Sequence, residues 1–408
     1  MNTPASSDVI VVGGGPAGSA TAMLLAARGH RVTLLDRARF PRDKACSEFM
    51  SPAATEALQR IGVLRDLERE PSARPLALRI STHAGHSLVG RFAAAPVAPW
   101  RSDGLALRRD RLDARLLAAA VDAGVRVCEG WTFDNLLREH STVAGVVARD
   151  SRGARREFRA PVTVGADGLR SLVARSMGGV KRGRRRRIAF VAHLAEVADV
   201  LPGYAEMHVF DRAYAGLNPI GDGLVSAAVV VPARCARLAR GRADQFLLDV
   251  LRDLPALEPR LRRAQIVRRT LVTGPFAQHA RATVAAGVAL VGDAAEFHDP
   301  FTGDGIHMAI RGAELLAPVV SSALAHQDVS APALSPYPRA RRRAFTGKRV
   351  VERLLALGIA HPRCFAACVR AIGRRPALAH TVVGVSGGFV PLTELLHPGL
   401  FLLPATAS

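Results

Sequence analysis

The beginning of the chain alternates short apolar runs with one glycine-rich segment. Asp8 to Val12 reads DVIVV, and β-branched apolar runs of this kind are typical of strands buried in a parallel sheet. The segment SATAMLLAARG that follows has helical spacing and ends at Gly29, a residue type that commonly terminates helices. Arg31 to Leu35 (RVTLL) is a second strand-like run, and Asp36 stands at its end. The pattern therefore predicts a strand, a helix and a second strand, which together form a βαβ unit.

The glycines between the first strand and the helix have the spacing G-x-G-x-x-G, at Gly13, Gly15 and Gly18. In this motif the first glycine permits a tight turn, the second lets the backbone approach a pyrophosphate, and the third lets the helix pack closely on the strand. The N–H groups and dipole at the start of the helix then face the phosphates. Asp36 lies near the offset of ~20 residues at which an acid binds the adenosine ribose. A dinucleotide site is predicted, with FAD and NAD both open at this point.

Two later segments repeat the pattern of an apolar strand that ends in an acid beside glycine. The first, Val162 to Arg175, contains Asp167 followed by glycine, and the second, Val288 to Asp293, reads VALVGD. A turn and a helical run from Ile306 to Leu316 follow the second strand. Acids at the carboxyl ends of parallel strands lie at the crevice where α/β sheets bind ligands.

The segments GGGPAG, GADG and GDAAEFHDPFTGDG match, in order and spacing, the signatures of a group of FAD-dependent oxidoreductases. This group includes group A flavoprotein monooxygenases, flavin-dependent halogenases and geranylgeranyl reductases, and the chain resembles it over roughly residues 8 to 320. The resemblance implies an α/β fold with a discontinuous, Rossmann-like FAD-binding domain of the GR2 type. It also implies an inserted substrate domain built on an antiparallel sheet, and C-terminal helices.

The resemblance also implies how the chain is divided. The FAD-binding domain is expected at residues 1–75, 100–180 and 275–330, the substrate-binding domain at 76–99 and 181–274, and a C-terminal helical region at 331–408. Independently, the alternating runs Ala189 to Val197, Glu206 to Phe210 and Leu224 to Val231 are strand-like. Helical spacing runs from Arg339 to Gly373 after a proline-rich connector.

Contacts to FAD follow from the same resemblance. It implies that Asp36 holds the adenosine ribose, that Asp293 binds the ribityl chain or pyrophosphate, and that Arg109 lies near the pyrophosphate. An exposed helix charge is the alternative for Arg109, and an ordinary strand-to-helix turn is the alternative for Asp167. The expected cofactor-binding residues are Gly13, Gly15, Pro16, Ala17, Gly18, Asp36, Arg37, Arg109, Asp167, Gly292, Asp293, Pro300, Gly303, Asp304, Gly305 and Ile306.

Within the group, the segment FPRDKACSEFMSP at residues 40 to 52 resembles the geranylgeranyl-reductase branch. Ser47 stands where that branch has glycine after the cysteine. Glu296 stands where the monooxygenase pattern GDAAH has histidine, and PFTGDGI again resembles the reductases. Tyr214 to Gly223 resembles their Tyr-x-Trp-x-x-Pro segment, with Gly216 and Leu217 in the tryptophan region.

We therefore expect an enzyme that reduces a C=C bond of a lipophilic, isoprenoid- or polyketide-like substrate. NADH or NADPH is expected as a transient donor, because the sequence contains no second G-x-G-x-x-G unit. The first alternative is a flavin monooxygenase that hydroxylates an aromatic or polyketide substrate with O2. The second, from another class, is a non-enzymatic basic binding protein on a vestigial nucleotide-binding fold.

The proton donor has several candidates near the three motifs. Cys46 and His307 are the expected catalytic residues, and Glu48, Tyr214 and His298 are further candidates. A buried inert thiol and a structural histidine are the alternatives for the first two. Cys364 and Cys368 share a helix face but lack further ligands at suitable spacing, so no metal is predicted.

Charge and composition limit the partners. Among 408 residues, 56 Lys and Arg against 35 Asp and Glu give a net charge of +21, and the apolar share of 49% excludes a mainly disordered chain. Dense basic runs at Lys181 to Arg187 and Arg339 to Arg349 are typical of solvated loops or helix faces, with anionic lipid or an acidic carrier protein as alternatives. No aromatic residues interleave the first run, so nucleic-acid binding is not expected.

The cellular location is predicted from the cysteines and the N-terminus. The five cysteines form no CxxC pair, and MNTPASSDV lacks the features of a secretory signal, which favours the cytoplasm. The long apolar stretch after Asp8 is interrupted by glycine and proline, so we expect peripheral membrane contact at most.

Overall fold

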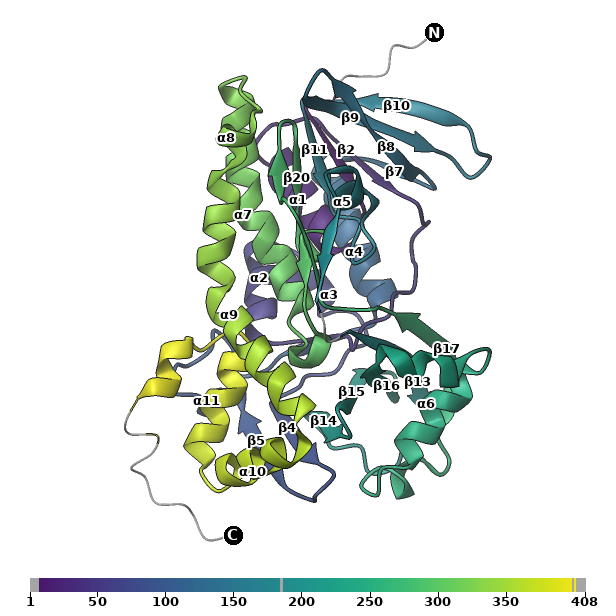
Figure 1. Cartoon of the computed structure of the whole chain (residues 1–408), viewed down its shortest axis with the longest axis vertical. Coiled ribbons are helices and arrows are strands. Elements are labelled where there is room, and N and C mark those ends of the chain that lie inside the picture. Colours follow the sequence, from purple (N-terminus) through teal and green to yellow (C-terminus); the bar gives the residue numbers. More distant parts are fainter. Residues whose placement is uncertain (1–6, 184–185, 398–399, 401–408) are drawn as a thin grey trace.

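The computed structural model describes residues 7–183, 186–397 and 400, and it contains two large sheets and a set of C-terminal helices (Figure 1). The first sheet has six strands in the order β19-β20-β11-β1-β2-β7. Its strands are β1 (Val9–Val12), β2 (Val32–Asp36), β7 (Arg126–Glu129), β11 (Val162–Gly165), β19 (Val284–Ala285) and β20 (Val288–Leu290). All neighbours pair in parallel except β19 with β20. The strands predicted at Asp8, Arg31, Val162 and Val288 therefore lie side by side.

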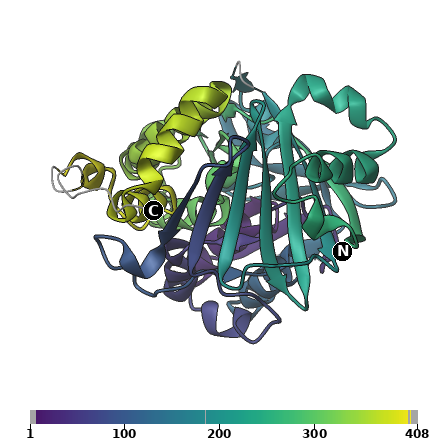
Figure 2. The ribbon, with the colours of Figure 1, turned by 90° about the horizontal axis from the view of Figure 1, so that it is seen from below.

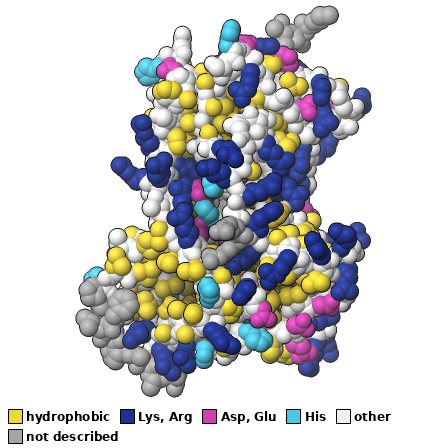
Figure 3. All heavy atoms as spheres, viewed as in Figure 1, with side chains coloured by type: hydrophobic (Ala, Val, Ile, Leu, Met, Phe, Trp, Pro, Cys, Tyr) yellow, Lys and Arg dark blue, Asp and Glu magenta, His cyan; other side chains and the backbone are white. Residues whose placement is uncertain are grey.

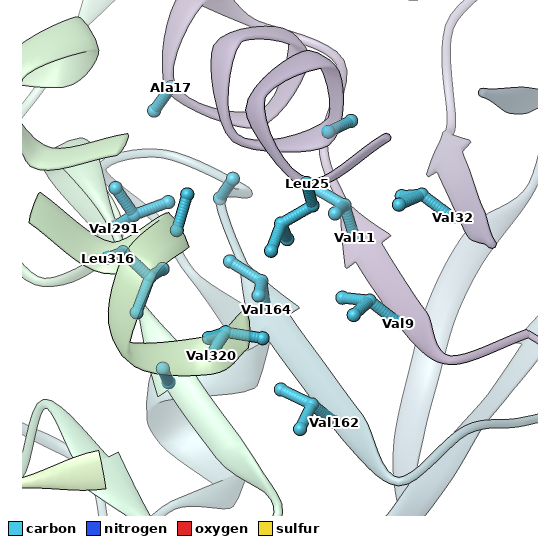
Figure 4. Close-up of a cluster of buried hydrophobic side chains, with 14 of the residues drawn as sticks. Val9, Val11, Ala17, Leu25, Val32, Val162, Val164, Val291, Leu316 and Val320 are labelled. Atoms are coloured by element: carbon cyan, nitrogen blue, oxygen red, sulfur yellow. The ribbon is translucent and has the colours of Figure 1, made fainter. Parts of the chain in front are cut away.

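Two layers cover this sheet. On one face, side chains from β1 and β11 point toward α1 (Pro16–Ala26) and α7 (Gly305–Ala325), as Figure 4 shows for Val9, Val164, Leu25 and Leu316. On the other face, Ile10 and its neighbours pack against a three-stranded sheet of β8 (Thr132–Glu139), β9 (Thr142–Arg149) and β10 (Arg155–Arg159). Each fully buried aliphatic side chain stabilises the fold by roughly 1.5–3 kcal/mol. The two apolar layers therefore hold the strands, and with them the strand ends, in place.

Helix α1 lies close against the first turn because its facing residues are small. Gly13 has φ +106°, a left-handed conformation that favours glycine. A Cβ atom on Gly18 would collide with the carbonyl oxygen of Gly13, so only glycine permits this approach of helix to strand. The N-terminus of α1 is thereby fixed at the carboxyl end of β1.

The second large sheet has seven strands in the order β17-β13-β16-β15-β14-β4-β5, which Figure 2 shows side by side. Its strands are β4 (Ala77–Thr82), β5 (Ser87–Arg91), β13 (Arg187–Ala195), β14 (Tyr204–Phe210), β15 (Ala213–Gly221), β16 (Leu224–Pro232) and β17 (Gln265–Thr273). One pair departs from the expected antiparallel arrangement: β4 and β14 are parallel, since a long excursion through the first sheet separates them in sequence. Helix α6 (Ala243–Arg252) covers one face of this sheet.

The C-terminal helices pack on α7, which covers the first sheet, and on β5 of the second sheet. They are α8 (Ala331–Leu334), α9 (Pro336–Ala360), α10 (Pro362–Gly373) and α11 (Pro376–Ser386). The helical spacing predicted from Arg339 to Gly373 is broken at His361, and α10 restarts with Pro362 at its first turn. Helices α10 and α11 pack on β5, whereas α9 packs on α7.

Shorter elements connect these layers. They are β3 (Phe49–Met50), α2 (Pro52–Arg60), α3 (Leu64–Leu67), β6 (Leu105–Ala106), α4 (Arg109–Asp122), α5 (Leu172–Ser176), β12 (Val180–Arg182), β18 (Gln278–Ala280) and β21 (Glu296–Phe297), with 3-10 turns η1 (Phe92–Ala94), η2 (Ala233–Ala239), η3 (Pro259–Leu261), η4 (Gly292–Ala294), η5 (Pro300–Thr302) and η6 (Leu392–Leu396). The mixed α/β architecture with C-terminal helices confirms the expected fold class. The domain limits given above stay a prediction.

Among the described residues, α7 is the one helix that is long and apolar enough to cross a membrane. The helical stretch Ala331–Ala360, which comprises α8 and α9, passes the same test together with α10 as a bent pair. Length and composition are the only grounds for this, and α7 packs against α1 in the core. Basic side chains are spread over the face shown in Figure 3, which also has an apolar area in its lower half. Residues 184–185 of the first basic run lie outside the described residues.

Candidate active site

A cavity lies where the carboxyl ends of the first sheet meet one face of the second sheet. Its walls come from segments far apart in sequence, and they are mostly apolar. The turns of the first sheet contribute Gly15, Pro16, Ala17, Gly168, Gly292, Asp293, Pro300, Gly303, Asp304, Gly305 and Ile306. The second sheet contributes Ala189, Val191, Ala205, Met207, Tyr214, Leu217, Ala228 and Val230, and α9 contributes Arg341 and Glu352.

The structure thus brings most of the expected cofactor residues to one cavity, whereas a few lie behind its wall. Gly13 and Gly18 form the close contact between β1 and α1 described above. Asp36 accepts hydrogen bonds from the backbone N–H groups of Gly14 (2.6 Å) and Ala38 (2.8 Å) at the end of β2. Arg37, next to it, is exposed.

The side chain of Asp167 serves the turn rather than the cavity. Its carboxylate accepts hydrogen bonds from the hydroxyl of Ser171 and from the backbone N–H groups of Leu172 and Val173, at the start of α5. Burial raises its pKa, and these hydrogen bonds oppose the rise. The carboxylate of Asp167 therefore stabilises an ordinary strand-to-helix turn. The neighbouring Gly168 lines the cavity.

Open space for a phosphate group exists at Gly15. A Cβ atom built there would meet only Nη2 of Arg42, at 3.7 Å, and one on Gly305 would meet nothing within 4 Å. Both residues lie at the N-termini of long helices, α1 and α7, where free N–H groups and the helix dipole favour negative charge. The residues present therefore fit a dinucleotide, whose negatively charged groups the N-termini of α1 and α7 would stabilise.

Arg109 is buried beside this space, so the exposed-charge alternative for it is wrong. It is 6% exposed, lines the cavity, and donates two hydrogen bonds to Asp113, at 2.8 and 2.7 Å. Burial lowers its pKa, but the carboxylate of Asp113 and the thiol of Cys46 raise it on balance. Arg42 also pairs with Asp113, at 2.9 Å, which holds the two guanidinium groups together.

Lys44 is a further cation of this region that sequence reasoning missed. It lines the cavity, and its Nζ lies 3.1 Å from the position of a Cβ atom on Gly168. Burial lowers the pKa of Lys44, the charge of Arg109 lowers it further, and the carboxylate of Asp293 opposes both. Asp293, at the end of β20, has its pKa raised by burial. A single lysine in a loop carries no periodic signal, so only the folded chain shows that it faces the cofactor motifs.

Acids of the third of the three sequence motifs, GDAAEFHDPFTGDG (residues 292–305), are paired with cations from α9. Glu296 binds Arg341 (3.0 Å), Arg349 (2.6 Å) and His298 (2.6 Å). Burial raises the pKa of Glu296, but these partners lower it to about 2. Asp304 pairs with Lys348 and with His307, each at 3.2 Å. The basic run Arg339 to Arg349 is therefore not simply a solvated helix face, because three of its cations bind acids of the cavity.

Two expected proton donors have structural partners. His307 does not line the cavity, and its Nδ1 faces the carboxylate of Asp304. Glu48 is fully buried, does not line the cavity, and binds His193 at 2.7 Å. Both side chains therefore support the walls.

Three further candidates line the cavity. Cys46 does so, and its Sγ accepts a hydrogen bond from the N–H of Glu48 at 3.3 Å. His298 is held by Glu296. The hydroxyl of Tyr214 donates to Asp299 at 2.6 Å, and Asp299 in turn pairs with Arg187 at 2.7 Å.

Glu352 of α9 also lines the cavity and was missed from the sequence. A signal for it exists, because the side of α9 that faces the protein follows helical spacing through Tyr337, Arg341, Phe345, Lys348, Glu352, Leu355 and Ile359. Charged residues on an otherwise apolar stripe indicate buried ionic groups.

This arrangement defines a class of protein, the FAD-dependent oxidoreductases, and comparison with known proteins confirms it. The family model of the FAD binding domain matches residues 6–352, so the chain belongs to that family.

Among the similar proteins are two reductases, each 28% identical to the chain. Menaquinone reductase of Mycolicibacterium smegmatis aligns over 96% of this chain and 93% of its own length. Digeranylgeranylglycerophospholipid reductase 2 of Methanopyrus kandleri aligns over 81% of each.

Two solved structures share the fold over nearly the whole chain. A myxobacterial chondrochloren halogenase has a TM-score of 0.79 at 25% identity, and the alignment covers 98% of this chain and 97% of the halogenase chain. A geranylgeranyl bacteriochlorophyll reductase-like protein of Thermoplasma acidophilum has a TM-score of 0.77 at 22% identity, and covers 94% of each chain.

Proposed function

We propose that this oxidoreductase reduces a C=C bond in a lipophilic substrate of the isoprenoid class, with NADH or NADPH as a transient donor. The observation that carries the proposal is the shared cavity: an apolar wall of the second sheet faces the turns that fit the flavin. An apolar wall favours a hydrocarbon chain, because burying apolar surface releases roughly 25 cal/mol per Å². The names of the two reductase relatives support the same substrate class.

The residues of the first sheet would hold FAD. The N–H groups at the start of α1 would bind the pyrophosphate, with Arg42, Lys44 and Arg109 supplying positive charge. A carboxylate has about four acceptor sites, so Asp36 can accept ribose hydroxyls in addition to its two backbone hydrogen bonds. Bound there, FAD supplies hydride-level redox chemistry.

The chain's own residues exclude water and position the substrate. Phe297, Phe301 and Met207 line the cavity and would contact a hydrocarbon chain. Tyr214 stacks edge-on against Phe301 with ring centroids 5.0 Å apart, and its hydroxyl is fixed by Asp299. Because the ion pairs of Asp299 and Glu296 neutralise the nearby charges, the apolar surface presents few free polar groups to the substrate.

The test uses purified holoenzyme under anaerobic conditions. The protein should be yellow, and NADH or NADPH should bleach the flavin. Mass spectrometry of a menaquinone and of a digeranylgeranylglycerophospholipid, each incubated with enzyme and donor, should show the gain of two hydrogen atoms in at least one of them. The Gly15→Val variant serves as the flavin-free control.

An assay with isotopically labelled O2 distinguishes this reaction from the monooxygenase alternative. If neither probe gains hydrogen, and an aromatic compound instead gains an oxygen atom from isotopically labelled O2, the enzyme is a monooxygenase. A purified protein that retains no flavin, even after incubation with FAD, would contradict both reactions.

A further inference from the structure

Six carboxyl groups line the cavity, and they differ in their partners. They are Glu206, Asp293, Glu296, Asp299, Asp304 and Glu352. Four of the six are ion-paired: Glu206 with Arg260, Glu296 with Arg341, Asp299 with Arg187, and Asp304 with Lys348. These four carboxyl groups are already engaged by cations, which makes them poor candidates for a proton donor.

Of the remaining two, Asp293 stands at the end of β20 among the cofactor motifs, close to Lys44 and Arg109. Glu352 stands on α9 and is 8% exposed. Its Oε2 is buried and has no hydrogen-bond partner among the described residues. An ionised carboxylate left unpaired in such a place costs several kcal/mol, so the neutral acid is favoured.

The charged groups around Glu352 do not reverse this preference. Lys348 and His298 favour the ionised form, whereas Asp304 and Glu296 disfavour it. Lys348 already binds Asp304 and the backbone oxygen of Ser386, and His298 already binds Glu296. Burial is the largest cause, and it raises the pKa of Glu352 to about 7. Near neutral pH this side chain can therefore both hold and release a proton, as a general acid must.

Two other cavity residues, Tyr214 and His298, are poorer proton donors. The hydroxyl proton of Tyr214 is already donated to Asp299, and a phenolate formed there would lie against that carboxylate. Burial raises the pKa of Tyr214 well above its ordinary value, and Asp299 raises it further. His298 is engaged by Glu296 through Nε2.

We propose that Glu352 is the catalytic proton donor of the C=C reduction, an inference that rests on the function proposed above. One alkene carbon takes a hydride from the reduced cofactor, and the adjoining carbon takes the carboxyl proton of Glu352. The π bond is lost, two C–H bonds form, and the cofactor is oxidised by two electrons. The Glu352 carboxylate regains its proton from water, and the nicotinamide donor reduces the cofactor again.

The experiment compares wild-type holoenzyme with Glu352→Gln, Glu352→Asp and, as the matched control, Glu258→Gln on the surface. Glutamine has the size of neutral glutamate but no acidic proton, so the variant should fold normally. Reduction of the flavin by NADH or NADPH should keep its wild-type rate. The anaerobic rate of hydrogen addition to the probe that the wild type reduces should fall on the order of 10²-fold, with partial recovery in Glu352→Asp.

A second readout is independent of turnover. The oxidised holoenzyme should show the infrared C=O band of a protonated buried carboxyl that disappears as pH rises through about 7, and this band should be missing in Glu352→Gln. If Glu352→Gln adds hydrogen at the wild-type rate, or if the band is missing in the wild type at pH 6, the role of Glu352 is overturned. If the wild type reduces neither probe although NAD(P)H reduces its flavin, the proposed reaction itself fails, and the infrared band still shows whether the cavity holds a neutral acid.

Discussion

Gly15 and Gly18 belong to one motif but differ in what a side chain would meet. Beside Gly15 there is open space, whereas a Cβ atom on Gly18 would strike the backbone of Gly13. We therefore expect Gly15 to leave room for a ligand, whereas Gly18 permits close packing of α1 on the turn.

Gly15→Val should leave the flavin-free protein folded, with a melting temperature close to that of wild-type apoprotein, and should abolish FAD retention. Gly18→Ala should instead destabilise the protein by about 1–3 kcal/mol, as overpacking does. Absorbance of the purified proteins and urea unfolding measure the two effects. Full flavin occupancy in Gly15→Val would contradict the position given to the pyrophosphate.

The raised pKa of Glu352 predicts that the free energy of unfolding depends on pH. Its pKa is raised from an ordinary 4.5 to about 7 in the folded protein, so between these values the folded state binds more protons than the unfolded state. Stability contributed by this group is thus present below pH 4.5 and is lost as pH rises through about 7, with a total of about 3 kcal/mol. Compared with Glu352→Gln, the wild type should lose stability across this range in urea unfolding. Parallel pH profiles for the two proteins would show that Glu352 is not buried as an acid.

The sequence predicts residues whose role follows from a local motif and misses those whose role depends on distant partners. The glycines and Asp293 are readable because a turn between strand and helix requires them at fixed spacing. Lys44 and Glu352 acquire their roles only when their segments fold against the motifs, from the loop after β2 and from α9. His307 has a clear local position, yet its actual partner is Asp304 rather than the cavity.

At the scale of elements, α9 connects the C-terminal region to the third motif. Its buried side carries Arg341, Lys348 and Glu352 among apolar residues, and its cations bind Glu296 and Asp304. The wall of the cavity is therefore held by ion pairs between α9 and the turn before α7.

Lys348→Met should break the pair with Asp304 and leave a buried carboxylate whose one remaining ion-pair partner among the described residues is His307. The expected loss of stability is about 3–5 kcal/mol at neutral pH, which urea unfolding can measure. Since Lys348 lowers the pKa of Asp304, the loss should shrink in acid, where that carboxylate becomes protonated. Arg342→Met, an exposed position on the same helix, is the control. Equal stability of the two variants would mean that the ion pair does not hold α9.

Sequence patterns predicted β1, β2, β11 and β20 of the first sheet, β13, β14 and β16 of the second sheet, and helical structure from Arg339 to Gly373. Each of these segments carries its own pattern of apolar residues. The other strands of the two sheets were not predicted. Nor did these patterns predict the break of the long helix at His361 or the parallel pairing of β4 with β14. The break has a local signal, because Pro362 follows His361 and proline disfavours helical backbone at the residue before it. The parallel pairing depends on how the chain returns after a long excursion, which no local pattern encodes.

At the scale of the whole molecule, the cavity joins the two sheets and the C-terminal helices, so its ligand should stabilise all three together. FAD at 100 times its dissociation constant should raise the stability of the apoprotein by about 2.7 kcal/mol and increase its melting temperature. Gly15→Val should show no such shift. An equal shift in both proteins would place the bound FAD elsewhere.

The resemblance to FAD-dependent oxidoreductases predicted the general plan of the molecule, and the family match confirms it. It could not predict which acids of the cavity are neutralised, since the ion pairs at Glu296, Asp299 and Asp304 join residues from different layers. The charge pattern of the cavity is a property of the assembled molecule.

The wall of the cavity includes both Gly15 and Glu352, which lie near opposite ends of the chain. During synthesis the glycine-rich turn leaves the ribosome long before α9 does. In addition, β1 has both of its neighbours only after β11 is made, and β11 only after β20 is made. A nascent chain therefore has no enclosed place for the chromophore until α9 has been translated. Yellow colour in a fusion or truncated product would report that the polypeptide has been made and folded at least as far as α9.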